Sequence, residues 1–149
     1  MKLFARCALH AGLAITALAA DARLKITDLP AAVQTAMKEQ IKGATIIGAS
    51  KERENGRLEY EVETRVNNKS RDLTFAENGT LLEVEQEVEL ASIPEAARAA
   101  IQKRVGGGKI RKVESVTRGP QVSYEAAVTR NGRHTEVAVN ADGTPHHED

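Results

Sequence analysis

Apolar residues recur at every fourth position between residues 29 and 41, which places them on one stripe of an α-helix of about three turns. The stripe consists of Leu29, Val33, Met37 and Ile41. Asp28 precedes Leu29-Pro30, and an acceptor side chain followed by proline is typical of a helix start. Gly43 is predicted to end the helix, because glycine readily takes the left-handed conformation that follows a last helical turn.

The pattern then changes to the alternation of a β-strand. Leu58, Tyr60, Val62, Thr64 and Val66 alternate with charged residues, and the Asn55-Gly56 pair before them is a strong hairpin signal, because a type I′ turn needs positive φ at both central positions. Extended runs also begin at Thr45, around Leu73 and at Leu82, separated by Asn67-Asn68 and Asn78-Gly79. One helix followed by four antiparallel strands is therefore predicted.

The chain then repeats this unit. A shift of 64 positions, without a gap, pairs Pro30 with Pro94, Gly43 with Gly107, Tyr60 with Tyr124 and Gly79 with Gly143. Matches at turn glycines and apolar helix positions indicate two copies of one supersecondary unit. In the second copy, Ser92 is predicted to cap a helix with the stripe Ile93, Ala97, Ile101 and Val105, and Gly106-Gly107-Gly108 to end it. Strands follow at 109–118, around Tyr124, and around Val137 and Val139.

These elements predict an α+β fold with two tandem helix-plus-antiparallel-sheet (α-β-β-β-β) units, in which each helix packs across a sheet. The first unit is expected at residues 21–91 and the second at 92–149, with 21–27 as a short leader. A unit of about 60 residues buries too little surface to be secure alone, so the two are expected to pack as one domain. Tyr60 and Tyr124 lie in line with the apolar strand positions and are predicted to be core residues.

Residues 1–20 have the pattern of a cleaved signal peptide. Lys2 and Arg6 form a basic start, an apolar run follows, and Ala17-Leu18-Ala19 is a small-x-small cleavage site. The alternative is a short N-terminal helix; the run is too short for a membrane span, which needs about 20 apolar residues. A periplasmic or secreted protein is predicted, without cysteine once Cys7 is removed and without a span in the mature chain.

Composition changes the picture in one respect. Cleavage leaves 19 basic and 21 acidic residues, which is not the basic surface that nucleic-acid binding requires. The acidic residues are concentrated on two predicted strands, where they alternate with apolar positions: Glu59, Glu61, Glu63, Glu83, Glu85, Glu87 and Glu89. If these strands are neighbours, like charges lie close together, at a cost in stability. This face is either a binding surface for a basic partner or a divalent cation, or a solvated face interleaved with Arg57, Arg65 and Lys69.

Other candidate chemistry is weaker. His146 and His147 could bind a transition metal, with Glu148, Asp149 and His134 as further ligands. The alternative is that these C-terminal residues form a disordered tail. Paired carboxylates also serve acid–base catalysis, but here they sit on regular strands without a nearby histidine or serine cluster. The glycine run at 106–108 follows a helix, whereas phosphate-binding glycines precede one. No enzyme activity and no cofactor are predicted.

The helix openings Leu29-Pro30-Ala31-Ala32-Val33 and Ile93-Pro94-Glu95-Ala96-Ala97, with the strand Leu58-Glu59-Tyr60-Glu61-Val62 and the turn Asn78-Gly79-Thr80, resemble the PepSY-like, beta-lactamase-inhibitor-like family over about residues 28–145. The resemblance implies a small exported bacterial protein that binds a protein or peptide partner, including the restraint of a peptidase. The alternative is a cation-responsive periplasmic module using the acidic face. The chain lacks the disulfides and aromatic-rich surface of the beta-lactamase inhibitor, so inhibition of that enzyme is not expected.

Overall fold

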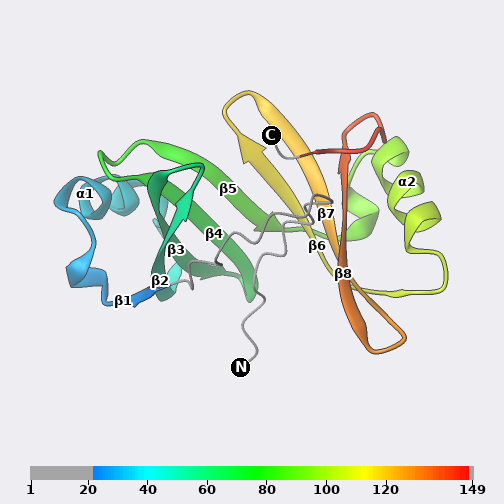
Figure 1. Cartoon of the computed structure of the whole chain (residues 1–149), viewed down its shortest axis with the longest axis horizontal. Helices are drawn as coiled ribbons and strands as arrows, with labels where there is room; N and C mark the ends of the chain where they lie inside the picture. The colour runs from blue at the N-terminus through cyan, green and yellow to red at the C-terminus, as the bar shows by residue number, and fades with distance from the viewer. Residues whose placement is uncertain (1–21, 148–149) are drawn as a thin grey trace.

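The structure is a computed structural model that describes residues 22–147 and consists of two helices and eight strands. The predicted signal peptide at residues 1–20 lies outside the described residues. Figure 1 shows the elements, which are β1 (Ala22–Leu24), α1 (Ala31–Gln40), β2 (Thr45–Glu54), β3 (Arg57–Val66), β4 (Lys69–Ala76), β5 (Leu81–Glu87), α2 (Glu95–Val105), β6 (Lys109–Arg118), β7 (Gln121–Arg130) and β8 (Arg133–Asn140). Short 3-10 turns at Ile26–Asp28 and Leu90–Ser92 precede the two helices.

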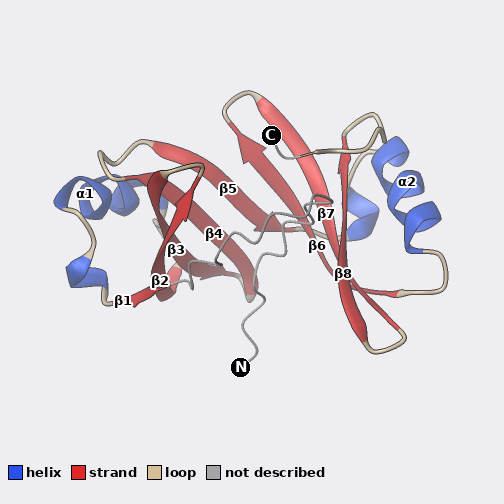
Figure 2. Ribbon diagram, viewed as in Figure 1, coloured by secondary structure: helices blue, strands red, loops and turns tan. Residues whose placement is uncertain are grey.

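All eight strands form one antiparallel sheet whose spatial order follows the chain from β1 to β8. The two repeats are joined inside this sheet by the pairing of β5 with β6, which runs from Val84 opposite Thr117 to Glu87 opposite Glu114. The predicted α+β fold is thus confirmed. The units do more than pack against each other, because the acidic strand that ends the first unit is also the neighbour of the first strand of the second (Figure 2).

Both helices cover the same face of the sheet. Helix α1 buries Val33 and Met37 against β3 and β4, and α2 buries Ile101 and Val105 against β6 and β7. The cross-strand partners of these core strand residues continue along one face from β2 to β8. Figure 1 places the helices at opposite ends of the molecule with the sheet between them, so the sheet curves, and the face opposite the helices lies inside the curve. We call this surface the open face.

The two apolar cores are aliphatic and equivalent in position. The first contains Leu29, Val62, Leu73 and the fully buried Phe75, and the second contains Ile93, Ala126 and Val139. Tyr60 is 6% exposed within the first core and Tyr124 packs against the second, so both tyrosines are core residues, as predicted.

Both N-caps predicted from sequence are wrong, and the C-cap residue of α1 is Ile41 rather than Gly43, whereas the glycine end predicted for the second helix is confirmed at Gly106. Neither Asp28 nor Ser92 accepts a hydrogen bond from a helix N–H group, and the residues at the N-cap positions are Pro30 and Pro94. Asp28 belongs to the preceding 3-10 turn, and the Ser92 hydroxyl donates to the Glu89 carbonyl at 2.8 Å. The residue between each 3-10 turn and the proline, Leu29 or Ile93, is buried in the core of its unit.

The hairpin turns agree with the sequence prediction. Asn55 and Gly56 have φ of 47° and 79°, and Asn131 and Gly132 have 51° and 76°, which are the positive values that a type I′ turn needs. The segment at 22–24, predicted as a leader, instead forms strand β1 and pairs with β2. Register shifts in β2 and β6 fall between Ile46 and Gly48 and between Ile110 and Lys112, which are equivalent positions in the repeat.

Candidate functional site: the open face of the sheet

Six of the seven predicted glutamates lie on the open face, because they alternate with the core residues of β3 and β5: Glu59, Glu61, Glu63, Glu83, Glu85 and Glu87. The seventh, Glu89, follows β5 and forms an ion pair with Lys69 at 2.7 Å. The sequence therefore predicts the side of the sheet on which these carboxylates lie.

The two acidic strands are not neighbours in the sheet. Strand β4 lies between β3 and β5, so that Thr74 separates Glu61 from Glu83 in one row of the open face. In the next row, Asp72 stands between Glu63 and Glu85. The like charges of β3 and β5 are thus spread over three strands, although Asp72 adds a carboxylate that the sequence analysis did not single out.

Several of these carboxylates have polar partners on the same face. The Ser50 hydroxyl donates to Glu61 at 3.3 Å, and Arg23 on β1 forms an ion pair with Glu63. Glu83, whose side chain is only 2% exposed, accepts Arg118 Nε at 2.8 Å and lies 2.6 Å from the other Arg118 nitrogen. The open face is therefore a network of charged and polar side chains, with acidic residues more numerous than basic ones.

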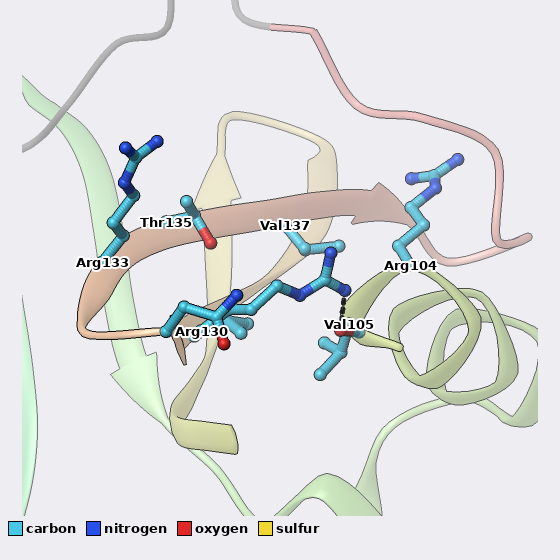
Figure 3. A pocket seen from close by; sticks show the side chains of 8 residues that line it. Arg104, Val105, Arg130, Arg133, Thr135 and Val137 are labelled. Carbon is cyan, nitrogen blue, oxygen red and sulfur yellow. Dashed lines mark hydrogen bonds between the residues drawn. The ribbon is translucent and has the colours of Figure 1, made fainter. Parts of the chain in front are cut away.

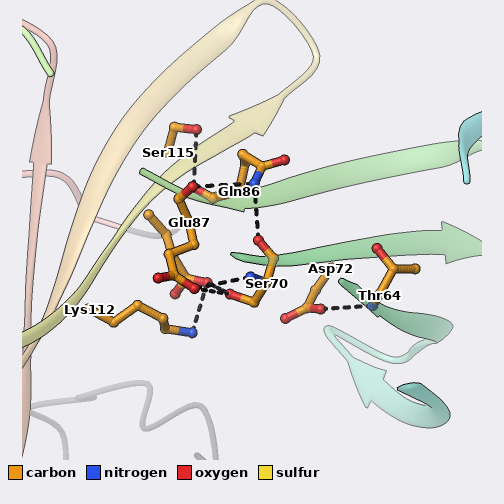
Figure 4. Close-up of polar contacts among 8 residues, drawn as sticks. Thr64, Ser70, Asp72, Gln86, Glu87, Lys112 and Ser115 are labelled. Atoms are coloured by element: carbon orange, nitrogen blue, oxygen red, sulfur yellow. Dashed lines mark hydrogen bonds and ion pairs between the residues drawn. The ribbon is translucent and has the colours of Figure 1, made fainter. Parts of the chain in front are cut away.

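The centre of this network connects β4, β5 and β6, where the two units meet (Figure 4). The Ser70 N–H donates to Glu87 Oε2 at 3.0 Å, and the Ser70 hydroxyl donates to Glu114 Oε1 at 3.3 Å. Lys112 Nζ lies 2.8 Å from the same Glu114 oxygen. Gln86 Nε2 donates to the Ser70 carbonyl at 3.1 Å. Of these contacts, the one from Ser70 to Glu114 crosses the junction between the repeats, whereas the Gln86 side chain approaches Ser70 from the helix-covered side, on which its cross-strand partner Arg71 lies.

Asp72 is the most perturbed acid of this region. The pKa of Asp72 is raised from 3.8 to about 6; burial is the main cause and the charges of Glu114 and Glu63 add to it, while the N–H of Thr64, which donates to Asp72, partly offsets the shift. Lys112 also lowers it. A carboxyl group that resists ionisation in a half-buried position destabilises the folded state at neutral pH.

We therefore expect Asp72→Asn to stabilise the protein at pH 7.5. The folded-state pKa lies above the unfolded value, so the penalty is fully present above about pH 6 and disappears as the pH falls below about 4. At 1.36 kcal/mol per pKa unit, the gain is at most about 3 kcal/mol and is reduced by partial exposure. Urea denaturation of both proteins at pH 7.5 and pH 4 measures it. An equal difference at the two pH values would contradict this assignment.

Two groups of carboxylates bring their oxygens within 4.8 Å of one another: Glu52, Glu54 and Glu59 in one, and Asp72, Glu85 and Glu114 in the other. In the second group, burial lowers the pKa of Lys112, but its hydrogen bond to Glu114 and the charges of Glu114 and Asp72 outweigh burial and raise it. This lysine supplies positive charge where a cation would sit. In the first group, burial followed by Glu54 and Glu52 raises the pKa of Glu59. The predicted cation-responsive role stays a prediction.

His146 and His134, two of the histidines predicted as metal ligands, have different polar partners and do not share a site. His146 Nδ1 lies 2.9 Å from the Asn140 side-chain oxygen, and the His146 N–H donates to Ala138 at 3.2 Å. His134 Nδ1 instead lies 3.2 Å from the Thr129 hydroxyl. His147 is exposed, and Glu148 and Asp149 lie outside the described residues. Within residues 22–147, no group of metal-ligand side chains includes a histidine.

The second unit does not reproduce the acidic face. Ser123 and Ala127 occupy the positions equivalent to Glu59 and Glu63, and Ser123 is 4% exposed. Glu125 is the counterpart of Glu61. Most of the acidic residues of the open face thus come from the first unit, and Glu114, Glu125 and Glu136 are those that the second unit adds. The sequence signal for Asp72 and Glu114 was present, since each alternates with buried neighbours, but only the strand order shows that they meet.

The fold and the open face define a class of small tandem-repeat α+β proteins with one helix-covered and one open sheet face. The PepSY family, described as peptidase propeptide and YPEB domain, matches residues 30–85 and 94–142, one segment in each repeat. The chain therefore belongs to the PepSY family, in agreement with the resemblance seen in the sequence. No curated protein sequence matches the chain. Within residues 22–147, neither helix is long and apolar enough to cross a membrane.

Solved structures share this fold at low sequence identity. A periplasmic protein from Bacteroides eggerthii is 16% identical with a TM-score of 0.64, and the match covers 78% of this chain and 85% of that one. A beta-lactamase-inhibitor-like protein from Bacteroides fragilis is 20% identical with a TM-score of 0.58, covering 79% and 83%. A DUF2874 family protein from Bacteroides ovatus is 16% identical with a TM-score of 0.61, covering 78% and 84%. These likenesses establish the fold.

Proposed function

We propose that this chain is an exported, non-enzymatic binding protein that holds a protein or peptide partner on its open face, and that a peptidase is the partner it restrains. The observation that carries the proposal is the placement of both helices on one face of a continuous sheet, which leaves the other face to a polar network of named carboxylates. Concentrating like charges on the uncovered face of an antiparallel sheet is unfavourable, and a partner of complementary charge would offset this cost.

The comparisons support the same conclusion. The description of the family to which the chain belongs names the propeptide of peptidases, which is a segment that accompanies a peptidase domain. The structural neighbours include a protein described as periplasmic and one described as like a beta-lactamase inhibitor. Together with the signal-peptide pattern of residues 1–20, they favour an exported protein that acts by contact with another protein.

The partner should be basic where it meets the first unit. Glu61, Glu85 and Glu87 lie on three rows of the open face and are each half-buried, so a docked partner would cover them readily. Charge complementarity of this kind increases the rate of association and selects between partners more than it adds affinity. Binding is therefore expected to weaken as salt is added, because exposed charges are screened over about 10 Å at 0.1 M ionic strength.

Affinity capture from the periplasmic fraction of the native host tests the proposal. The bait is compared with Glu61→Gln/Glu85→Gln/Glu87→Gln and with a matched control that removes three carboxylates away from the open face, at Glu39, Glu77 and Glu95. We expect one protein to be retained by the wild type and the control and lost from the open-face variant. Retention by all three baits would contradict the proposal. A rise in melting temperature with millimolar Ca²⁺ that Glu85→Gln abolishes would favour the cation alternative instead.

A further inference from the structure

The two repeats differ at one edge of the sheet. In the first unit, β4 is paired along its outer side by β5, with Phe75 opposite Leu81, Leu73 opposite Val84 and Arg71 opposite Gln86. The equivalent strand of the second unit is β8, which is the last strand of the sheet. On its outer side, the described residues provide the single bridge between Val139 and Pro145 and the hydrogen bond from His146 to Ala138.

This bridge reproduces the first step of the β4–β5 pairing. Val139 and Pro145 are the residues equivalent to Phe75 and Leu81 under the 64-residue shift. Beyond it, the outer edge of β8 from Arg133 to Val137 has no paired strand among residues 22–147. Such an edge presents backbone N–H and C=O groups in the geometry that another extended chain can pair with.

A cavity of about 460 Å³ opens beside this edge, on the helix-covered side of the sheet. Figure 3 shows that it lies between the end of α2 and the β7–β8 hairpin. Its apolar lining comes from Val105, Val128 and Val137, and its polar lining includes three arginines and no carboxylate: Arg104, Arg130, Arg133, Asn131 and Thr135. A pocket with an apolar floor and only positive charges around it is suited to an anionic side chain.

One of the differences between the repeats at this cavity is the residue that reaches from the sheet to the helix end. In the first unit, Arg71 crosses the equivalent space and its guanidinium donates to the carbonyl of Gln40, the last residue of α1, at 2.8 Å. The residue equivalent to Arg71 in the second unit is Thr135, which is too short to reach the helix. Arg130 instead donates to the Val105 carbonyl from the β7 side, and the space in front of Thr135 is left open.

The arginines around the opening differ in their contacts and exposure. Arg130 is engaged by Val105, whereas Arg104 donates to Ala138 at 3.2 Å and Arg133 is exposed. In Figure 3 the side chains of Arg104 and Arg133 extend to the same side, with Thr135 and Val137 between them. A single guanidinium group binds a carboxylate through two parallel hydrogen bonds, so either of these arginines, which flank Thr135 and Val137 from opposite ends, can select an acidic side chain.

We propose that the β8 edge binds an extended acidic peptide segment of a partner protein as a ninth strand. The segment runs antiparallel to β8 in the place that β5 takes beside β4. An apolar residue faces Val137, as Val84 faces Leu73, and an acidic residue faces Thr135, where Gln86 faces Arg71 in the first unit. Backbone pairing supplies affinity, and the carboxylate between Arg104 and Arg133 supplies specificity. This surface is separate from the open face and does not depend on the function proposed for it.

The test uses the full chain and two fluorescein-labelled peptides in anisotropy titrations. One peptide has the sequence of residues 84–90, which starts at the position facing Val137 and so leaves the Val139–Pro145 bridge intact, and the other carries the change Gln86→Glu, so that they differ by one charge at the position facing Thr135. We expect the glutamate peptide to bind about tenfold more tightly, as for the gain of a charge-assisted hydrogen bond. Equal affinity for the two peptides would overturn the proposal, as would the absence of binding by either.

Protein variants locate the site. Thr135 is exposed, and Thr135→Glu places a carboxylate opposite the acidic residue of the peptide, so like-charge repulsion should abolish the preference for the glutamate peptide. Arg104→Gln/Arg133→Gln should do the same, whereas the matched pair Lys103→Gln/Arg111→Gln, exposed and outside the cavity lining, should bind as the wild type does. Melting curves confirm folding. A preference that survives Thr135→Glu would place the peptide elsewhere and contradict the proposal.

A third comparison separates strand addition from simple anion binding. The glutamate peptide N-methylated at alternate amides keeps its charge but cannot pair with the β8 edge, and we expect it to lose binding. Inorganic phosphate at the same concentration should not displace the unmethylated peptide. Displacement by phosphate together with full binding of the methylated peptide would show a small-anion pocket and overturn the proposed strand.

Discussion

Ile101→Ala and Met37→Ala should each lower the free energy of unfolding by about 2–5 kcal/mol, the range for buried aliphatic truncations. Ile101 is fully buried in α2 and Met37 is 4% exposed in α1, and each faces the core strands of its own unit. Truncation removes apolar surface from the core and leaves a cavity that the surrounding sheet cannot fully close, because the cross-strand pairing fixes its curvature. Urea denaturation followed by circular dichroism measures both effects.

Glu39→Ala provides the control for this pair. Glu39 is on the outer side of α1, its side chain is 72% exposed, and its ion pair with Lys42 at 3.0 Å is an exposed one that contributes little. The change should be nearly silent. Because the two units share one sheet, we also expect a single unfolding transition in both core variants. Small and equal effects at all three positions would contradict the assignment of the helix stripes.

Gly79→Ala and Gly143→Ala should destabilise the protein by a similar amount, about 2–4 kcal/mol each, since a strained φ and a steric clash combine. The two glycines are equivalent in the repeat and have φ of 84° and 83°. A Cβ at Gly79 would lie 2.7 Å from the carbonyl oxygen of Ala32, and one at Gly143 would lie 2.7 Å from that of Ala96. These carbonyls belong to the first helical turns, so the turn after β4 or β8 must pass against the helix backbone.

Gly56→Ala separates the two causes. Gly56 has φ of 79°, but a Cβ there would meet nothing within 4 Å, so its substitution carries the conformational strain without the clash. We expect it to cost about 1 kcal/mol, clearly less than either packed glycine. Thermal melts of the three variants measure the difference. If Gly56→Ala were as damaging as the other two, the close approach of turn and helix would have no energetic role.

The elements of this fold are strongly encoded in local sequence. The four-residue stripe through Val33 and Met37, the alternation through Tyr60 and Val62, and the Asn-Gly hairpins each predict an element by a local rule, and the 64-residue repeat predicts each one twice. The capping predictions failed because Asp28 and Ser92 each lie in a 3-10 turn that places a buried apolar residue before the proline. Strand β1 was missed because three residues carry too little pattern to identify a strand.

The candidate site depended on information that local patterns do not contain. Alternation places Glu63, Asp72 and Glu85 on one face, but it does not order the strands, and the interposed β4 is what brings Asp72 between the two glutamates. In the same way, Glu114 meets Ser70 only because β5 and β6 join the units into one sheet. The cavity lined by arginines includes a space that Arg71 crosses in the first unit and that the shorter Thr135 leaves open in the second. This difference becomes visible only when the two units are compared.

The most direct test of the open face as the binding surface is the dissociation constant of the captured partner. It should be measured by isothermal titration calorimetry for the wild type, for Glu61→Gln/Glu85→Gln/Glu87→Gln, and for the matched variant at Glu39, Glu77 and Glu95, at low and high salt. The account predicts a Kd about tenfold or more higher for the open-face variant at low salt, with a smaller dependence on salt, and an unchanged Kd for the matched variant. Equal dissociation constants for all three proteins at both salt concentrations would contradict it.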